Sequence, residues 1–167
     1  MADGLSIKTR DRIGIASVMA RKGAGAAAVG TRLGIDLPTK PGAVFSSNRS
    51  IIGTGPGTWM VIEEDAGPDF SETLGATLAG VASVSDQSSA YVVQRLSGLP
   101  ARTLLQRGAA IDFHPSAFAT GSAATTIISH IGVILWQVDD QPTYDVAVFR
   151  SFTSSFNYWL AQASRAI

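Results

Sequence analysis

The stretch from Ser83 to Gly108 constrains the fold more than any other, because it closes one run of alternating structure and begins another. A strand from Ser83 leads into the polar turn Asp86–Ser89, and Ala90–Leu96 is a second strand rich in β-forming residues. Pro100 suits the first turn of a helix, where its missing N–H is no loss, and Gly108 is well placed to end that helix. The stretch therefore predicts strand, turn, strand and helix.

Before this stretch, apolar spacing and turn residues predict a unit of order β-α-β-β-α-β, the split pattern typical of ferredoxin-like folds. The polar start, Met1–Arg12, is expected to be frayed. Asp69 and Glu72 match a capping box at the start of the second helix. Strands are expected at Ile13–Ala20, Thr58–Glu63 and Val81–Asp86, with two short pieces, or one continuous strand, near Ala43–Ser47 and Ser50–Thr54, and helices at Ala24–Leu33 and from Asp69 to Gly80.

After Ala90 the pattern begins again as β-α-β-β-β-α. Three strands are expected at Thr125–His130, Val133–Val138 and Thr143–Phe149, separated by turns at Ile131-Gly132 and Asp139–Pro142. Ser151 is expected to cap a last helix, whose apolar face is Phe152, Phe156, Trp159, Leu160 and Ala163. We therefore predict an α+β fold of two ferredoxin-like units, βαββαβ then βαβββα, in a single domain over residues 1–167 with sub-units at about 13–86 and 88–165.

Composition narrows the classes of function. The absence of cysteine excludes thiolate nucleophiles, disulfides and cysteine-ligated metal centres. Thirteen basic residues balance thirteen acidic ones and are scattered, so neither a nucleic acid nor an anionic membrane is an expected partner. The longest strongly apolar run, Ile131–Trp136, is too short to span a bilayer, so we expect a soluble protein. The absence of cysteine is compatible with the cytoplasm, which is the expected location. Only 16% of residues are charged while 46% are hydrophobic, which favours a surface partly covered by another protein.

Two glycine-rich segments match nucleotide-binding loops only in part. Gly23–Ala28 fits the G-x-G-x-x-A pattern, but Arg21 and Lys22 lengthen the turn, and Phe45–Asn48 stands where a ribose-binding acid belongs. Gly53–Gly57 precedes a strand, whereas phosphate loops use the N–H groups of a following helix. We predict a helix packed closely on a sheet for the first segment and a hairpin turn for the second.

Polar residues give no complete catalytic or metal-binding pattern. His114 and His130 have no carboxylates at ligand spacing, and Glu63–Asp65 is typical of a solvated strand edge. Ser122 lacks the context of a nucleophile elbow. We expect no catalytic, cofactor-binding or metal-binding residue in this chain.

Asp86, Arg95 and the pair Arg150-Ser151 are better candidates for a polar site, and each has a structural alternative. Asp86 and Arg95 lie near the junction of the two halves, where an Asx turn at Asp86 and a solvent-facing side chain of the pleated strand at Arg95 would also explain them. Arg150-Ser151 precedes a helix start, where an anion or a partner's carboxylate could bind, although simple capping explains it too.

Several short motifs follow one another along the chain. They are Gly55–Met60 before a strand, Ser85–Ser88 at a turn, Leu96–Ala101 and Leu104–Gly108 around one helix, and Phe149–Phe152 with Tyr158–Leu160 near the end. Their order and spacing resemble the sarcosine oxidase gamma subunit family. Leu99 before Pro100 is a small departure, one inserted residue at the helix entry.

The resemblance implies a fold like the folate-binding domain of glycine-cleavage aminomethyltransferases, and a non-catalytic gamma subunit of heterotetrameric sarcosine oxidase. Such a complex oxidatively demethylates sarcosine to glycine and transfers the one-carbon unit to tetrahydrofolate. FAD, FMN, NAD and tetrahydrofolate are then expected in the partner subunits and none in this chain alone. The expected partners are the alpha, beta and delta subunits, with alpha in direct contact.

A stand-alone folate-binding, aminomethyltransferase-like protein is the alternative that fold analogy leaves open. Such a protein needs one carboxylate to orient the pterin and another near its reactive nitrogen. Asp86 and Asp112 are the candidates.

Overall fold

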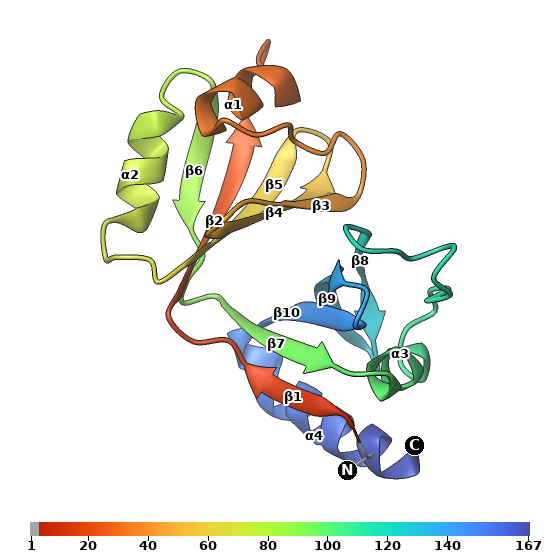
Figure 1. The fold of residues 1–167 in the computed structure, drawn as a ribbon. Coiled ribbons are helices and arrows are strands. Elements are labelled where there is room, and N and C mark those ends of the chain that lie inside the picture. Colours follow the sequence, from red (N-terminus) through yellow and green to blue (C-terminus); the bar gives the residue numbers. More distant parts are fainter. Residues whose placement is uncertain (1–3) are drawn as a thin grey trace. The chain divides into compact units, whose positions relative to one another are not determined.

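The chain divides into two compact units, and the computed structural model in Figure 1 describes residues 4–167. The first unit is Asp11–Ser89, and the second is Ala90–Ile167 together with the N-terminal segment that ends at Arg10. In the described residues each unit contains one five-stranded sheet, and every strand pair is antiparallel. The predicted α+β class is confirmed, while a single domain stays a prediction.

The first unit follows the predicted order with one strand more. Its elements are β2 (Ile13–Ala20), α1 (Ala26–Leu33), β3 (Gly42–Phe45), β4 (Arg49–Gly55), β5 (Thr58–Glu64), α2 (Phe70–Thr77) and β6 (Ala82–Asp86). The sheet order is β3-β4-β5-β2-β6, and β2, β4, β5 and β6 take the ferredoxin-like places. The two short pieces of sequence are therefore separate strands, and β3 is an additional edge strand.

The helices of the first unit cover one face of its sheet (Figure 1). Trp59 and Val61 on that face pack with Leu74 of α2. Asp69 stands at the N-terminus of α2 but makes no side-chain cap hydrogen bond, so the predicted capping box is wrong. The burial of apolar residues along α2 holds the helix in place instead.

The second unit contains the remaining elements. They are β1 (Ser6–Thr9), β7 (Tyr91–Ser97), α3 (Pro100–Gln106), β8 (Ala123–Ile128), β9 (Ile131–Asp139), β10 (Thr143–Phe149), the 3-10 turn η1 (Arg150–Phe152), α4 (Thr153–Ala163) and the 3-10 turn η2 (Ser164–Ala166). Their sheet order is β1-β7-β10-β9-β8.

The N-terminal segment contradicts the prediction of a frayed start. Its first three residues lie outside the described part, but Ser6–Thr9 forms β1, which pairs with β7 from Ser6 opposite Ser97 to Thr9 opposite Gln94. Leu5, just before the strand, is buried in the core of the second unit. Pairing with a distant strand thus orders residues whose local sequence is mainly polar.

With β1 included, the two units have the same topology. The strand orders of the two sheets, β6-β2-β5-β4-β3 and β1-β7-β10-β9-β8, match strand by strand, and the helices follow equivalent strands. In the first unit the outer strand β6 comes after the second helix. In the second unit β1 takes that place, so the second unit is completed by the beginning of the chain.

The β8–β9 hairpin turns at residues that the sequence placed in a strand. Ser129 and His130 both have positive φ, 47° and 67°, as in a tight type I′ hairpin. Ile131 and Gly132, predicted as the turn, belong to β9. The turn thus contains no glycine. The prediction of a turn at Ile131-Gly132, which relied on the glycine there, is therefore wrong by two residues.

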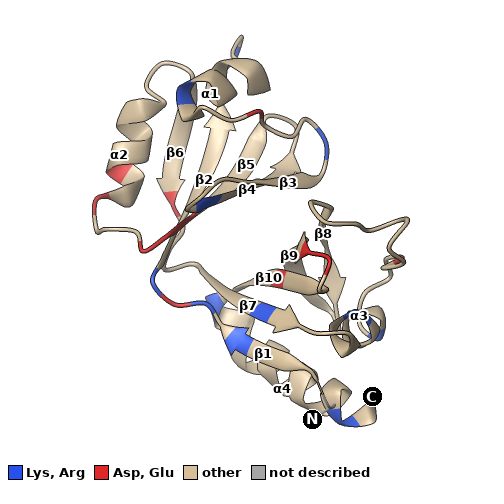
Figure 2. Ribbon diagram, viewed as in Figure 1, with Lys and Arg blue, Asp and Glu red and all other residues tan. Residues whose placement is uncertain are grey.

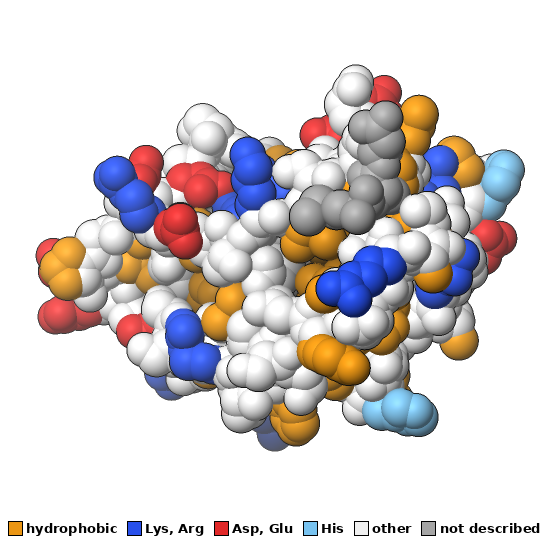
Figure 3. Space-filling view, turned by 90° about the horizontal axis from the view of Figure 1, so that it is seen from below, with side chains coloured by type: hydrophobic (Ala, Val, Ile, Leu, Met, Phe, Trp, Pro, Cys, Tyr) orange, Lys and Arg blue, Asp and Glu red, His pale blue; other side chains and the backbone are white. Residues whose placement is uncertain are grey.

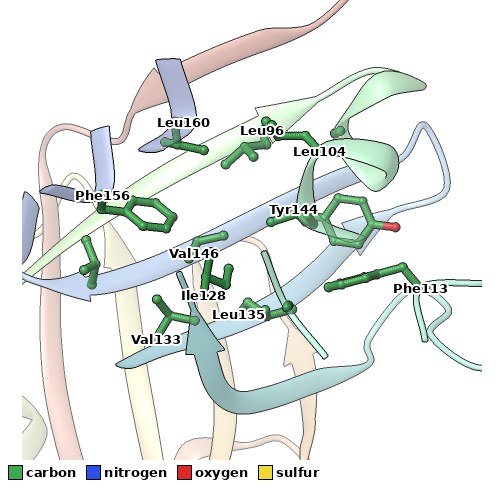
Figure 4. Packing of buried hydrophobic residues seen from close by; sticks show 14 of the residues in the cluster. Leu96, Leu104, Phe113, Ile128, Val133, Leu135, Tyr144, Val146, Phe156 and Leu160 are labelled. Atoms are coloured by element: carbon green, nitrogen blue, oxygen red, sulfur yellow. The ribbon is translucent and has the colours of Figure 1, made fainter. Parts of the chain in front are cut away.

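The core of the second unit lies between its sheet and the helices α3 and α4. Figure 4 shows Leu96, Tyr144 and Val146 of the sheet directed toward Leu104 of α3 and Phe156 of α4. The last helix departs from prediction at its start. Ser151 lies in η1 and does not cap α4, which begins at Thr153 without a side-chain cap, and Phe152 is 49% exposed rather than on the buried face.

Gly108 follows the end of α3, but packing rather than backbone conformation requires glycine at this position. Its φ is not among the positive ones, so it is not a left-handed cap. A Cβ at this position would collide with the Trp159 ring and stand 2.8 Å from Cγ2 of Ile128. Glycine is therefore required because α4 and β8 pack closely against this point.

Charged residues are spread over both units. Figure 2 shows basic and acidic positions on strands, loops and helices alike, and on the face in Figure 3 the Lys and Arg side chains are dispersed among uncharged ones. Within residues 4–167, no helix has the length and apolar character that crossing a membrane requires.

Candidate functional site

Three charged side chains meet on the sheet of the second unit. Arg95 of β7 and Asp145 of β10 stand directly opposite each other, one residue away from Leu96 and Tyr144, which pack with the helices. Since successive side chains of a strand point to opposite faces, Arg95 and Asp145 lie on the face away from α3 and α4. Arg10 follows β1 and extends its pairing, because its N–H donates to the Val93 carbonyl at 2.9 Å.

Both oxygens of the Asp145 carboxylate accept hydrogen bonds from arginines. Arg95 donates from Nε to Oδ1 at 2.7 Å and from Nη2 to Oδ2 at 2.8 Å, and Arg10 donates from Nη1 to Oδ2 at 2.9 Å. The Asp145 side chain is fully buried and that of Arg10 is 7% exposed, whereas that of Arg95 is 36% exposed. We call Arg10, Arg95 and Asp145 the ion cluster.

The geometry of the ion cluster fits a structural role. The paired bonds from Arg95 match the planar guanidinium to the carboxylate, and charge-assisted bonds of this kind are among the strongest in proteins. A buried carboxylate with its oxygens engaged in three N–H bonds is poorly placed to act as a base or a nucleophile. The ion cluster instead ties the end of β1 to its neighbour β7 and to β10 on the far side of β7.

The sequence identified only one member of the ion cluster. Its context singles out Arg95, for which a solvent-facing role is the alternative, and the structure pairs Arg95 with Asp145. Arg10 and Asp145 were missed. The available signal was an acidic residue inside the apolar run Thr143–Phe149, an arrangement that usually requires a buried cation nearby.

Asp86 forms the Asx turn that its sequence context favours. Its Oδ1 accepts the Ser88 N–H at 2.8 Å, and the Ser88 hydroxyl oxygen accepts the N–H of Ile15 at 3.0 Å. The backbone hydrogen bond from Ser88, then its hydroxyl, lower the pKa of Asp86, against a small opposing effect of burial. The carboxylate is thus stabilised as part of a turn that is fastened to β2.

Asp112 lies in the loop after α3, in the second unit, whereas Asp86 belongs to the first. The Asp112 Oδ1 accepts the N–H of His114 at 2.8 Å, a local turn like that of Asp86. Each of the two candidate folate-binding carboxylates therefore accepts a hydrogen bond from a backbone N–H of its own unit.

Among the described residues, neither the histidines nor Glu63–Asp65 belong to a cluster of potential metal ligands. His114 is exposed in the loop, with Nδ1 2.7 Å from the Ser116 hydroxyl, and His130 is exposed in the hairpin turn. Glu63 pairs with Arg49 at 2.5 Å. Within residues 4–167, no group of three or more His, Asp or Glu side chains could hold a metal ion.

The glycine-rich segments have structural roles in the described fold. Gly25 precedes α1, and within α1 a Cβ on Gly30 would lie 2.6 Å from the carbonyl oxygen of Ile35, so close backbone packing requires glycine there. Residues 53–57 lead through the turn between β4 and β5, where Gly57 has a φ of 63°. The hairpin turn is confirmed. The helix also packs on the sheet as predicted, through Ala26 and Val29, whereas a Cβ on Gly23 or Gly25 would meet no atom within 4 Å.

Arg150 lies in η1 at the end of the sheet. Its N–H donates to the Ala90 carbonyl at 2.8 Å and its Nη2 to the Tyr91 carbonyl at 3.3 Å. The Tyr91 ring stacks on Phe149 with centroids 4.5 Å apart, and burial raises the pKa of the Tyr91 hydroxyl. These contacts join the beginning of β7 to the end of β10.

Comparison with known proteins gives a consistent picture. The model of the sarcosine oxidase gamma subunit family matches residues 18–166. A solved heterotetrameric sarcosine oxidase from Corynebacterium sp. U-96, in complex with pyrrole 2-carboxylate, contains a chain with 25% identity and a TM-score of 0.87. The likeness covers 97% of this chain and 84% of that one. A search of curated proteins gave no match.

A second solved structure shares the fold at low identity. It is the glycine cleavage system aminomethyltransferase T from Bartonella henselae, with 10% identity and a TM-score of 0.71 over 94% of this chain. The match spans 45% of the transferase, so this chain corresponds to less than half of it. The expected likeness to an aminomethyltransferase domain is confirmed at the level of fold.

Proposed function

Because the chain belongs to the sarcosine oxidase gamma subunit family, we propose that it is a non-catalytic gamma subunit of a heterotetrameric sarcosine oxidase. The observation that carries the proposal is the near full-length structural likeness to a chain of such an enzyme. In this role the chain supports larger catalytic subunits, which demethylate sarcosine oxidatively to glycine and pass the one-carbon unit to tetrahydrofolate.

The proposal assigns the cofactors to the other subunits. FAD, FMN, NAD and tetrahydrofolate are bound by the partners, which are the alpha, beta and delta subunits, with alpha in direct contact and the complex in the cytoplasm. The use of both Asp145 oxygens inside the fold supports a structural role, because the most buried carboxylate of the described chain is committed to holding strands together.

No specific observation favours the alternative of a stand-alone folate-binding transferase. At 10% identity, the likeness to the aminomethyltransferase speaks for the fold alone. Asp86 and Asp112, its candidate residues, are each engaged in a local turn.

Co-expression tests the proposal directly. The chain, carrying an affinity tag, is produced with the candidate alpha, beta and delta chains and purified through the tag and by size exclusion. We expect one peak that contains the chain and absorbs as a flavoprotein, with sarcosine-dependent formation of hydrogen peroxide. A chain that elutes apart from flavin-bearing partners under all conditions would overturn the proposal.

A further inference from the structure

A groove in the second unit lies between the outer face of α3 and the loop that follows it. Arg102, Gln106 and Arg107 line the helix side, and Asp112 and His114 line the loop side, around a volume of about 740 Å³. In the sequence, Asp112 and His114 belong to no common pattern. The structure brings them together with two arginines of the helix.

Hydrogen bonds fix the walls of this groove. Gln106 donates from Nε2 to the Ile111 carbonyl at 2.8 Å, and its Oε1 accepts the Phe113 N–H at 3.3 Å. Phe113 is fully buried and anchors the loop in the core, where its ring meets that of Tyr144 edge-on (Figure 4). A ligand segment therefore meets a surface that is largely formed beforehand, which lowers the entropic cost of binding.

Both arginines are oriented by neutral oxygen atoms. Arg102 donates from Nε to the hydroxyl oxygen of Tyr144 at 3.3 Å, and Arg107 donates from Nη2 to the Ala166 carbonyl at 2.7 Å. Within residues 4–167, neither guanidinium forms an ion pair with a carboxylate. The bonds therefore hold the side chains in place without cancelling their positive charge.

The charge of the groove indicates what can occupy it. Two guanidinium groups outweigh the single carboxylate of Asp112, whose Oδ1 already accepts the His114 N–H. Oriented arginines bind carboxylates with paired, charge-assisted hydrogen bonds, and arginine is enriched where proteins recognise one another. A partner segment rich in Asp or Glu complements this surface, whereas a basic segment would be repelled.

We propose that the groove between α3 and residues 112–115 docks an acidic segment of the large partner subunit, with Arg102 and Arg107 contacting its carboxylates. This inference rests on the proposed function, since it names the surface through which a gamma subunit would be held. It concerns assembly and requires no chemistry in this chain.

The test measures assembly of the whole complex. The double variant Arg102→Gln/Arg107→Gln is compared with Arg21→Gln/Lys22→Gln, which removes the same charge from an exposed turn of the first unit. Each tagged chain is immobilised and the purified large subunits are passed over it at low and at high salt. We expect the groove variant to bind at least about tenfold more weakly than the control, with a smaller loss of affinity on adding salt.

A third variant separates charge from folding. Arg102→Lys/Arg107→Lys keeps both charges and should recover part of the affinity, while circular dichroism checks that every variant melts like the wild type. Equal binding by the groove and control variants, or equal weakening of both, would overturn the inference and leave the proposed function intact. Wild-type chain that fails to bind the large subunits would overturn the proposed function, and this inference with it.

Discussion

Replacing Asp145 by asparagine should destabilise the second unit by about 3–5 kcal/mol, the range found when one partner of a buried ion pair is removed. The fully buried carboxylate accepts three N–H bonds, at 2.7, 2.8 and 2.9 Å. Asparagine is similar in size but neutral. One carboxylate oxygen is replaced by an NH2 group, which cannot accept hydrogen bonds from the arginine N–H groups that it faces. The Arg10 side chain, 7% exposed, would lose the charge-assisted bond to Asp145 while keeping its own charge in a buried position.

Urea unfolding of the purified chain, followed by tryptophan fluorescence at neutral pH, measures this change through the free energy of unfolding. We expect the loss in free energy of unfolding to increase with the number of hydrogen bonds that a variant removes. Arg10→Gln removes one of the three bonds to Asp145 and leaves the bidentate pair with Arg95, so its cost should be about 1–3 kcal/mol, below that of Asp145→Asn.

The matched control is Asp65→Asn. Asp65 also pairs with an arginine, Arg12, at 2.8 Å, but the two side chains are 70% and 80% exposed. Exposed pairs contribute at most about 1 kcal/mol, because water and salt screen them. If Asp145→Asn costs no more than Asp65→Asn, the reasoning is refuted, since the arginines would then reach solvent and the ion cluster would not hold the strands.

Two further predictions concern close packing and a turn. Gly108→Ala should destabilise the chain by about 1–3 kcal/mol, because the added Cβ would collide with the Trp159 ring. The control Gly132→Ala should be nearly neutral, because no atom lies within 4 Å of the added Cβ. Equal melting temperatures for the two variants would contradict this prediction. Asp86 should titrate below the ordinary aspartate range in an NMR pH series, and the stability that it contributes should be present above its unfolded pKa and be lost as the pH falls through the folded one. Asp86→Asn should keep the turn and remove that pH dependence, and an ordinary titration midpoint in the wild type would speak against the turn hydrogen bond.

Most strands and helices could be predicted because their signals are local. Pro100 begins α3 as its fixed φ suggests, and β7 falls within a residue of the predicted run. The Asx turn at Asp86 also depends only on atoms two residues apart. Propensity, periodicity and turn chemistry act over one or two turns of chain, so the sequence of such a segment contains most of what determines it.

Only the tertiary structure decided the features that join distant segments. Ser6–Thr9 looks like a loose polar start, yet it is a strand because β7 offers an unpaired edge and the core admits Leu5. The turn at Ser129-His130 follows from the register of β8 with β9 rather than from its composition. Register and edge pairing depend on which strands meet, and local propensity does not specify that.

The ion cluster shows the same division within the candidate site. The sequence by itself supplied an arginine near a turn and an acid inside an apolar strand. Arg10 and Asp145 are separated by 135 positions, and no spacing rule connects them. Folding places β1 and β10 on either side of β7, and the cost of burying Asp145 without a cation makes that arrangement specific.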